Sequence, residues 1–417
     1  MKFKKTFLLA VTLSIVLALS LSAAAQDLIV NTYTSDPAPR KAMKELVAQY
    51  EEKNPDVDVE LNITAHEDFK QAIRVWLSSD SPPDVFSWFA GERANYFIDR
   101  GLIMDITDVW EEENLYEKFP KAFQSISIQD DKAYFMPHNY YWWSVFYRES
   151  IFEEYDLEEP QTWEELLEVG ETLKANGITP FAIGTKFRWT AAGWFDYLNL
   201  RINGADFHRK LMAGEIPFTD ERIEEVFKKW KYLIENDFFT EDAAAYSWQE
   251  ALQSMSQGDA AMYLMGQFLL DATSEEVAKD INFFRFPVID EDVPLAEDLP
   301  TDGFMIPKNA QNPEAAKDFL AFLSSVEGQR GFAEDVGRLV TNKEMPDKYY
   351  TELANKGRKM VDNTDKLTQF YDRDMNPELA DKTMDSLMAF WHSPEDYESI
   401  MEQMEAHRQE FLESQNN

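Results

Sequence analysis

Two hydrophobic patterns alternate along residues 28–61, LIVNTYTSDPAPRKAMKELVAQYEEKNPDVDVEL. The apolar run at 28–30 indicates a buried strand, and a polar loop follows over 32–36. Between 43 and 50, apolar side chains recur at the three- and four-residue spacing of one helix face. Apolar and polar residues then alternate over 57–61, as in a strand with one buried face. A strand, a helix and a second strand in this order predict an α/β fold with a largely parallel sheet.

The alternation continues along the chain. It predicts a helix over 69–77 and a strand at 85–86. Thr162 and Glu165 have the spacing of a capping box and open a further helix, and Asn312-Pro313 opens another. About 390 residues are enough for two domains, and no repeat or long flexible linker separates the segments. We therefore expect two domains joined by short crossing segments.

The composition excludes several classes of protein. The chain has 417 residues, with 40 Lys and Arg against 77 Asp and Glu, and its net charge is −37. Nucleic acids and anionic membranes are disfavoured as partners, because their phosphates require a basic surface. The acidic residues are scattered, which favours a solvated surface suited to high salt over a site that attracts cations. The absence of Cys excludes disulfides, thiolate metal sites and a Cys nucleophile.

The N-terminus has the pattern of a secretory signal peptide. Three Lys within the first five residues precede an apolar run over 7–21, and three Ala at 23–25 supply a cleavage site. We expect residues 1–25 to be removed and the mature chain to begin at Gln26. Because the chain has no Cys to carry a lipid, the expected location is the periplasm of a Gram-negative cell, without a lipid anchor.

Five blocks of sequence resemble one known family. They are KAMKELVAQYEEKNPDVDVE (41–60), PPDVFSWFAGERANYFIDRGLIMDITD (82–108), FYRESIFEEYDLEEPQTWEELLEVGETLKANGITPFAIG (146–184), GDAAMYLMGQF (258–268) and GFMIPKNAQNPEAAKDFLAFLSSVEGQ (303–329). In this order and spacing they resemble the extracellular solute-binding proteins of sugar ABC transporters, a group that has maltose-binding protein as a more distant member. The resemblance covers nearly the whole mature chain.

The resemblance implies a two-lobed periplasmic binding protein fold of the type II kind. The N-terminal lobe would comprise residues 26–137 and 302–345, and the C-terminal lobe residues 138–301 and 346–417. A mono- or oligosaccharide would bind between the lobes and close them by a hinge motion. The permease subunits of an ABC transporter in the inner membrane would recognise the closed form. We expect a monomer with no metal, no cofactor and no catalytic activity.

Candidate ligand contacts in the first lobe follow the ends of predicted strands. A sugar needs polar partners for its hydroxyls and flat rings for its C–H face. Ser35 and Asp36 lie in the loop after the first strand, at the carboxyl end of the sheet where α/β folds bind ligands. Asp36 would equally suit the N-cap of the next helix. Trp88, Glu92 and Arg93 follow the third strand, where the resemblance implies an aromatic and an acid–arginine pair; the alternative for the pair is a surface salt bridge.

The other candidates come from the crossing segments and the second lobe. Strand alternation divides the six rings of 137–148, PHNYYWWSVFYR, between two faces. The resemblance assigns 137–141 to a crossing and 143–147 to the core, and it leaves Trp142 undecided. The candidates are His138, Asn139, Tyr141, Trp189, Gln267, Phe268, Asp302 and Trp391, with Arg338 and Arg373 as weaker ones.

Two alternative functions stay open. Aromatic clefts with paired carboxylates also suit a secreted carbohydrate-active enzyme, although no catalytic motif marks one. A cationic ligand such as a polyamine would suit the same fold and the negative net charge. Residues 372–376 begin like a calcium loop, but Pro377 and Thr383 replace the Gly and the bidentate acid that such a loop requires.

Overall fold

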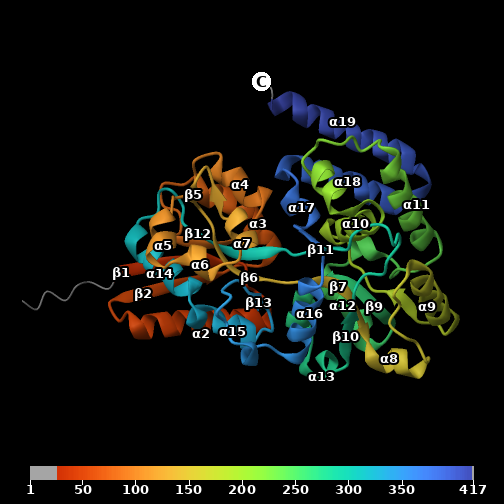
Figure 1. Cartoon of the computed structure of the whole chain (residues 1–417), viewed down its shortest axis with the longest axis horizontal. Coiled ribbons are helices and arrows are strands. Elements are labelled where there is room, and N and C mark those ends of the chain that lie inside the picture. The colour runs from red at the N-terminus through yellow and green to blue at the C-terminus, as the bar shows by residue number, and fades with distance from the viewer. Residues whose placement is uncertain (1–25, 416–417) are drawn as a thin grey trace, which may run out of the picture.

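The computed structural model describes residues 26–415, and the predicted signal peptide lies outside this range. Two α/β lobes lie side by side and are connected by extended segments (Figure 1). Each lobe combines segments that are distant in the sequence, because the chain crosses between the lobes more than once. Within residues 26–415, no helix has both the length and the apolar character needed to span a bilayer.

Six strands form the sheet of the first lobe, in the order β13-β6-β12-β3-β1-β2. They are β1 (Gln26–Thr32), β2 (Val57–Ile63), β3 (Val85–Phe89), β6 (Met136–Tyr140), β12 (Thr301–Met305) and β13 (Leu339–Val340). β1 is parallel to β2 and β3, as predicted, but β12 is antiparallel to β3 and β6, and β13 is antiparallel to β6. The sheet is mixed because strands that leave for the second lobe and strands that return from it run in opposite directions.

Both faces of this sheet are covered, so β3 is buried throughout. Val85 packs into the core on one face, and Phe86 and Trp88 pack into the core on the other. A short hairpin, β4 (Ile128–Gln129) and β5 (Lys132–Ala133), lies beside the sheet. The helices are α2 (Pro37–Lys53), α3 (His66–Leu77), α4 (Glu92–Ile98), α5 (Thr107–Glu112), α6 (Leu115–Lys118), α7 (Lys121–Ser125), α14 (Pro313–Ser324) and α15 (Val326–Glu334).

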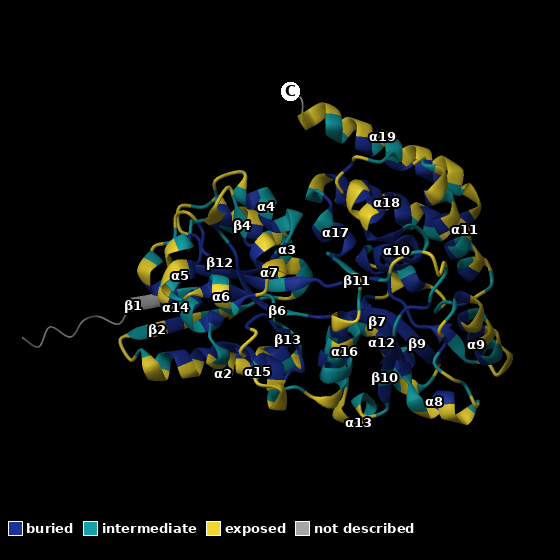
Figure 2. Cartoon of the chain, viewed as in Figure 1, coloured by how far each residue is buried: buried dark blue, intermediate teal, exposed yellow. Residues whose placement is uncertain are grey.

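The second lobe is built around a four-stranded sheet in the order β10-β7-β9-β8 and a parallel pair, β11 and β14. These strands are β7 (Trp143–Arg148), β8 (Thr179–Phe181), β9 (Ala260–Gly266), β10 (Ile281–Phe284), β11 (Ala296–Asp298) and β14 (Lys366–Thr368). Its longer helices surround one large core (Figure 2). They are α9 (Trp163–Ala175), α10 (Trp189–Met212), α11 (Glu221–Glu235), α12 (Trp248–Gln257), α16 (Glu352–Asp362), α18 (Pro377–His392) and α19 (Tyr397–Gln415).

Shorter elements complete the second lobe: α8 (Glu149–Glu154), α13 (Glu275–Ala278), α17 (Tyr371–Asp374) and the 3₁₀ turn η2 (Gln267–Ala272). The predicted capping box is present, because the Thr162 side chain accepts from the Glu165 amide and the Glu165 carboxylate accepts from the Thr162 amide. Two crossings, β6 to β7 and β11 to β12, run side by side, with the Tyr141 amide donating to the Pro300 carbonyl at 3.3 Å. β6 stays in the first sheet through Tyr140, so the expected division at residue 137 falls inside this strand.

Candidate functional site: a cleft between the lobes

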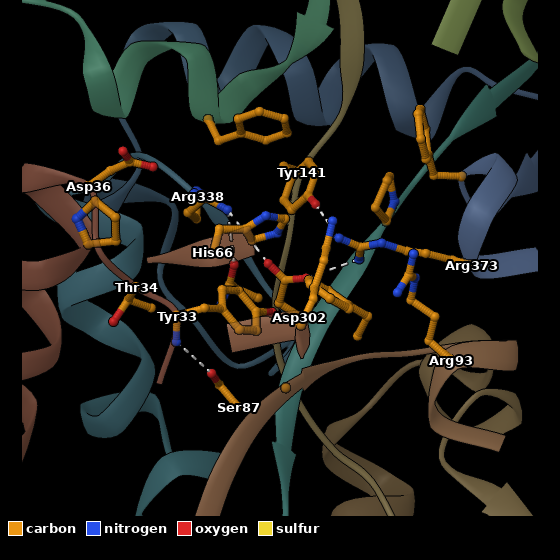
Figure 3. A pocket seen from close by; sticks show the side chains of 18 of the residues that line it. Tyr33, Thr34, Asp36, His66, Ser87, Arg93, Tyr141, Asp302, Arg338 and Arg373 are labelled. Atoms are coloured by element: carbon orange, nitrogen blue, oxygen red, sulfur yellow. Dashed lines mark hydrogen bonds and ion pairs between the residues drawn. The ribbon is translucent and has the colours of Figure 1, made fainter. Parts of the chain in front are cut away.

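A cavity of about 110 Å³ lies where the two lobes meet, next to the crossings. The first lobe supplies mainly polar groups, and the second lobe supplies mainly rings (Figure 3). The polar wall comprises Tyr33, Thr34, Asp36, His66, Lys70, Arg93, Asn139, Asp302 and Arg338. The aromatic wall comprises Tyr141, Trp143, Trp189, Trp248, Phe268 and Phe370, and it is joined by Asp372 and Arg373 of α17.

Arg373 is the centre of the polar network. Its Nη1 donates to Asp302 Oδ1 at 3.0 Å and to the Thr301 carbonyl at 3.1 Å, and its Nη2 donates to the Tyr141 hydroxyl at 2.6 Å. The guanidinium also lies over the Phe89 ring, 4.5 Å from its centroid. Burial favours the neutral form of Arg373, but Tyr141 and Asp302 outweigh burial, so its pKa lies above the ordinary value. Arg373 therefore stays charged and ties α17 to β12.

A second arginine, Arg93, joins the lobes at the side of the cavity. It donates from Nε to the Asp372 carbonyl at 2.9 Å and forms an ion pair with the Asp372 carboxylate. Burial opposes ionisation of Asp372, but Arg93 and Lys70 outweigh it, so the pKa of this carboxyl lies below its usual range. Gly91, at the start of α4, has a φ of +80°, and a Cβ there would lie 2.5 Å from the Arg373 carbonyl oxygen. Only glycine permits this approach of α4 to α17.

Arg338 forms the third link between the lobes. It pairs with the buried carboxylate of Asp271 in η2, and its guanidinium lies 5.0 Å from the centroid of the Tyr141 ring. Its Nη1 is 4.0 Å from Asp302 Oδ2, so Asp302 lies between Arg338 and Arg373 (Figure 3). Burial raises the pKa of Asp271 to about 6, although Arg338 opposes this shift. With these links the lobes lie closed against each other.

Glu67 organises the opposite end of the polar wall. Its Oε1 lies 3.1 Å from His66 Nδ1 and 3.4 Å from Lys70 Nζ, and it accepts from Trp189 Nε1 of the second lobe at 3.2 Å. Burial and the adjacent Lys70 lower the pKa of His66, so the imidazole is neutral near pH 7. The contact with Glu67 assigns the imidazole proton to Nδ1, which leaves Nε2 as an acceptor.

Phe268 is central to the aromatic wall. Its ring lies edge-on to Tyr141, with centroids 5.0 Å apart, and to Trp248 at 5.3 Å. Trp189 makes a further edge contact with Phe268 at 6.0 Å. Behind it, Trp143 stacks on Phe370 with centroids 4.6 Å apart and an interplanar angle of 23°. Rings fixed by neighbours in this way form a preorganised apolar face.

Seven predicted site residues line the cavity: Asp36, Arg93, Asn139, Tyr141, Trp189, Phe268 and Asp302. Both weaker candidates, Arg338 and Arg373, line it as well. Asp36 occupies the N-cap position of α2 without a capping hydrogen bond from its side chain, so its carboxylate is available to a ligand. Ligand contact by each of these residues stays a prediction.

Six predicted residues do not line the cavity: Ser35, Trp88, Glu92, His138, Gln267 and Trp391. The Trp88 ring is buried in the first lobe and donates from Nε1 to the Arg93 carbonyl. Glu92 accepts a local hydrogen bond from Asn95, and the Gln267 amide donates to the Val336 carbonyl. Ser35 is partly exposed beside the cleft.

His138 and Trp391 are the clearest members of this group. His138 is fully buried, and its ring packs edge-on against Phe304 and Phe332. It points to the core because neighbouring residues of a strand face opposite sides, and Asn139 takes the cavity side. Trp391 packs against Trp230 and Phe239 on the outer part of the second lobe.

Sequence reasoning also missed part of the lining. It assigned Trp143 to packing, and it did not name Tyr33, His66, Lys70, Trp248, Phe370 or Asp372 as contacts. Tyr33 and His66 follow β1 and β2 at the carboxyl edge of the sheet, so the rule that selected Asp36 would have found them. Phe370 and Asp372 have no local signal, because tertiary packing alone brings α17 to the cavity.

Comparisons with known proteins agree with this architecture. Residues 34–330 match the family of bacterial extracellular solute-binding proteins, and the chain belongs to this family. The solved structure of the bacterial solute receptor AcbH, described as having an exclusive preference for β-D-galactopyranose, is 30% identical, with a TM-score of 0.89 over 93% of this chain and 99% of that one.

Two relatives are similar in sequence. An uncharacterized ABC transporter extracellular-binding protein of Pyrococcus horikoshii is 28% identical over 77% of this chain and 73% of its own length. The alpha-glucosides-binding periplasmic protein AglE of Rhizobium meliloti is 26% identical over 64% of this chain and 62% of its own length. The expected family and two-lobed fold are therefore confirmed.

Proposed function

We propose that this chain is the sugar-binding component of an ABC transporter and that its ligand is a single pyranose. The observation that carries the proposal is a cavity between the lobes with one wall of charged and polar groups and one of aromatic rings. A pyranose has hydroxyls around its edge and C–H groups on its faces, and it needs both kinds of wall. Names of relatives support a sugar, since AcbH is described with a galactopyranose and AglE with alpha-glucosides.

The size of the cavity favours a monosaccharide over an oligosaccharide. Its volume is about 110 Å³. Because one water-sized sphere takes ~10–15 Å³, this volume holds roughly ten such spheres. One hexose has about twelve non-hydrogen atoms, which is a similar number. A second sugar unit would require the lobes to separate at Arg93–Asp372 or at Trp189–Glu67.

The polar wall offers both acceptors and donors for hydroxyls. Asp36 and Asp302 accept, Arg373 and Lys70 donate, and His66 accepts through Nε2. A buried donor or acceptor without a partner costs ~1–3 kcal/mol, so a sugar with one hydroxyl reversed should bind ~10–100-fold more weakly.

The same charges disfavour the alternatives. Asp302 is already paired with Arg373, and Asp372 with Arg93, so these carboxylates are not free to hold a polyamine. A glycosidase requires a protonated carboxylic acid beside the scissile bond. Asp302 and Asp372 are each paired with an arginine, and Asp372 is held ionised, so neither suits that role. We propose a binding protein without catalytic activity that acts as a monomer in the periplasm and delivers its sugar to a permease.

A thermal-shift screen tests the proposal. We expect a monosaccharide, with D-galactose tested first, to stabilise the purified chain by ~2.7 kcal/mol at 100 times its dissociation constant. Oligosaccharides built from the same monosaccharide should not stabilise the chain at equal concentration, and neither should spermidine. Stabilisation by spermidine and by no sugar would overturn the proposal, and so would release of new reducing ends from oligosaccharides at enzyme-like rates.

A further inference from the structure

We propose that Asp196, His208 and Asp298 bind a divalent transition-metal ion of the Zn²⁺ class in the core of the second lobe. One oxygen of each carboxylate and one imidazole nitrogen lie within 4.8 Å of one another. This cluster is separate from the lining of the cleft, and the proposal does not depend on the identity of the sugar. It departs from the expectation, drawn from the sequence, that the protein needs no metal.

A break in α10 brings the histidine to the carboxylates. Asp196 and His208 are twelve positions apart, which would separate them by about 18 Å along a straight helix. Gly204 has a non-helical backbone, with φ 75° and ψ 170°, and the helix changes direction there. As a result His208 Nδ1 lies 3.9 Å from Asp196 Oδ1. β11 supplies Asp298 from its last residue.

The three side chains are fully buried, and each is left incompletely satisfied. Asp196 uses Oδ2 to accept from the Tyr371 amide, and Asp298 uses Oδ1 to accept from the Thr368 hydroxyl. Asp196 Oδ1 and Asp298 Oδ2 have no hydrogen-bond partner within the described part of the chain. Buried polar atoms are nearly always satisfied, so two unpartnered carboxylate oxygens at one point indicate a missing partner.

That partner should carry positive charge. Among the ion pairs of residues 26–415, neither Asp196 nor Asp298 has a Lys or Arg partner. The nearest arginine in the sequence, Arg201, is already held by Glu297 and by the carbonyls of Phe286 and Ala296. Two carboxylates and a neutral imidazole balance one divalent ion, whereas without it the carboxyls could stay in a dry core only by binding protons.

The donor set selects the kind of ion. Two carboxylate oxygens and one imidazole nitrogen suit Zn²⁺, which takes four ligands from N, O and S. Ca²⁺ would need six to eight oxygens. Asn199 is the candidate for the fourth position, since its side-chain amide lies 3.2 Å from His208 Nδ1. The Asn199 oxygen accepts from the Asn203 side-chain amide at 2.8 Å, so both amides would have to turn over for Asn199 to present its oxygen to the ion.

An ion here would support the ligand site from behind. Asp196 holds the first amide of α17, the helix that carries Asp372 and Arg373. Asp298 ends β11 directly before the crossing that leads to Asp302. We therefore expect removal of the ion to loosen both elements and to weaken ligand binding without a change in the groups that touch the ligand.

Metal analysis of the tag-free chain tests this proposal directly. Because the cluster is buried, an ion cannot readily enter or leave the folded protein. The protein is therefore unfolded in denaturant with chelator, refolded with Zn²⁺ or with chelator alone, and dialysed. We expect about one Zn²⁺ per chain and a higher melting temperature for the Zn²⁺-refolded sample. Co²⁺ should substitute and give the visible absorption of a tetrahedral site.

Variants locate the ion. Asp298→Asn and Asp196→Asn keep the acceptors for Thr368 and Tyr371 but should lose the metal and the Zn²⁺-dependent rise in melting temperature. His138→Gln, which alters a buried histidine of the first lobe, should keep both. Metal below about 0.1 equivalent after refolding with Zn²⁺, together with no shift in melting temperature, would overturn the proposal. Equal metal content in Asp298→Asn and the parent would do so as well, and the metal content of the parent decides the question if a variant does not fold.

Discussion

The two lobes contribute opposite chemistry to the same cavity. In the first lobe, side chains at the carboxyl ends of β1, β2 and β3 are mostly charged or polar, because parallel strands end together at this edge. In the second lobe, Trp189 begins α10, Trp248 begins α12 and Phe268 follows β9, and all three present rings. The first lobe is therefore suited to forming hydrogen bonds with sugar hydroxyls, and the second to packing against the apolar face of a sugar.

Arg373 is the exception that couples the walls. It belongs to α17 of the second lobe, but its guanidinium donates to Asp302 of the first sheet. Closure thus removes the charge of Arg373 from water beside a partner from the other lobe. The division of labour can be tested by asking which wall carries affinity and which residues carry stability alone.

The largest effect should come from Arg373→Met, which removes one of the links between the walls, the one to Asp302 and Tyr141. Asp302 and the Tyr141 hydroxyl would be left without their shared donor. We expect affinity for the sugar to fall at least ~100-fold, and the free energy of unfolding to fall by ~3–5 kcal/mol. Calorimetric titration and urea unfolding measure the two changes.

Arg209→Met is the matched control, because Arg209 lies in the same lobe and its side chain is 46% exposed. It should change neither affinity nor stability by more than ~0.5 kcal/mol. If Arg373→Met binds the sugar as tightly as the parent, Arg373 does not couple the walls.

Next in size is the contrast between two tryptophans of the second lobe. Trp189→Ala removes a ring from the aromatic wall and should weaken sugar binding ~10–100-fold. Trp391→Ala removes a partly buried ring that packs against Trp230 and Phe239, and it should cost ~2–3 kcal/mol of stability while affinity stays within about twofold. Titration and thermal unfolding of both variants test the contrast, and a large affinity loss in Trp391→Ala would restore it as a site residue.

Two buried groups, one in each lobe, should respond to acid in opposite ways. Burial lowers the pKa of His138 in the first lobe to about 4, so the unfolded chain takes up its proton first as the pH falls. The contribution of the neutral His138 to the free energy of unfolding is fully present above pH ~6.5, and ~2 kcal/mol of it is lost by pH 5. Burial raises the pKa of Asp374 in the second lobe to about 7, so its contribution is present below pH ~4 and is lost as the pH rises through 7.

Melting temperatures at pH 7 and pH 5 separate these contributions. On acidification, His138→Gln should lose about 2 kcal/mol less stability than the parent, because the buried histidine is gone. Asp374→Asn, which keeps the acceptor for the Gln369 amide, should lose more than the parent. Shifts of the same sign in both variants would show that His138 and Asp374 do not respond to acid in opposite ways.

Local patterns predicted the elements of the first lobe, because hydrophobic period and capping chemistry act over a few residues. The strand at 28–30 and the helix through 43–50 appear as β1 and α2. The mixed sheet was not predicted, since the return of β12 depends on where a distant segment re-enters. Period alone cannot supply that information.

The same distinction separates the correct from the incorrect parts of the candidate site. Asp36 and Arg93 line the cavity because they follow strands whose ends the sequence located. His138 was nominated beside Asn139 although alternation along a strand sends one of the two to the core. Phe370 and Asp372 were missed because α17 is four residues long and reaches the cavity through packing across the whole lobe.

The smallest and most specific test removes one oxygen atom at the junction of the two walls. The Tyr141 ring is 95% buried and packs on Phe268, so replacement by Ala would lower both affinity and stability. Tyr141→Phe keeps the ring and removes only the hydroxyl that accepts from Arg373. We expect affinity to fall ~3–10-fold, or about 1 kcal/mol, with stability nearly unchanged. Tyr147→Phe, which removes a hydroxyl bonded to Glu159 farther along the same segment, should leave affinity unchanged. Equal losses of affinity in both variants would mean that the Tyr141 hydroxyl acts through the fold of the second lobe. It would then not act through Arg373, which joins the two walls of the cavity.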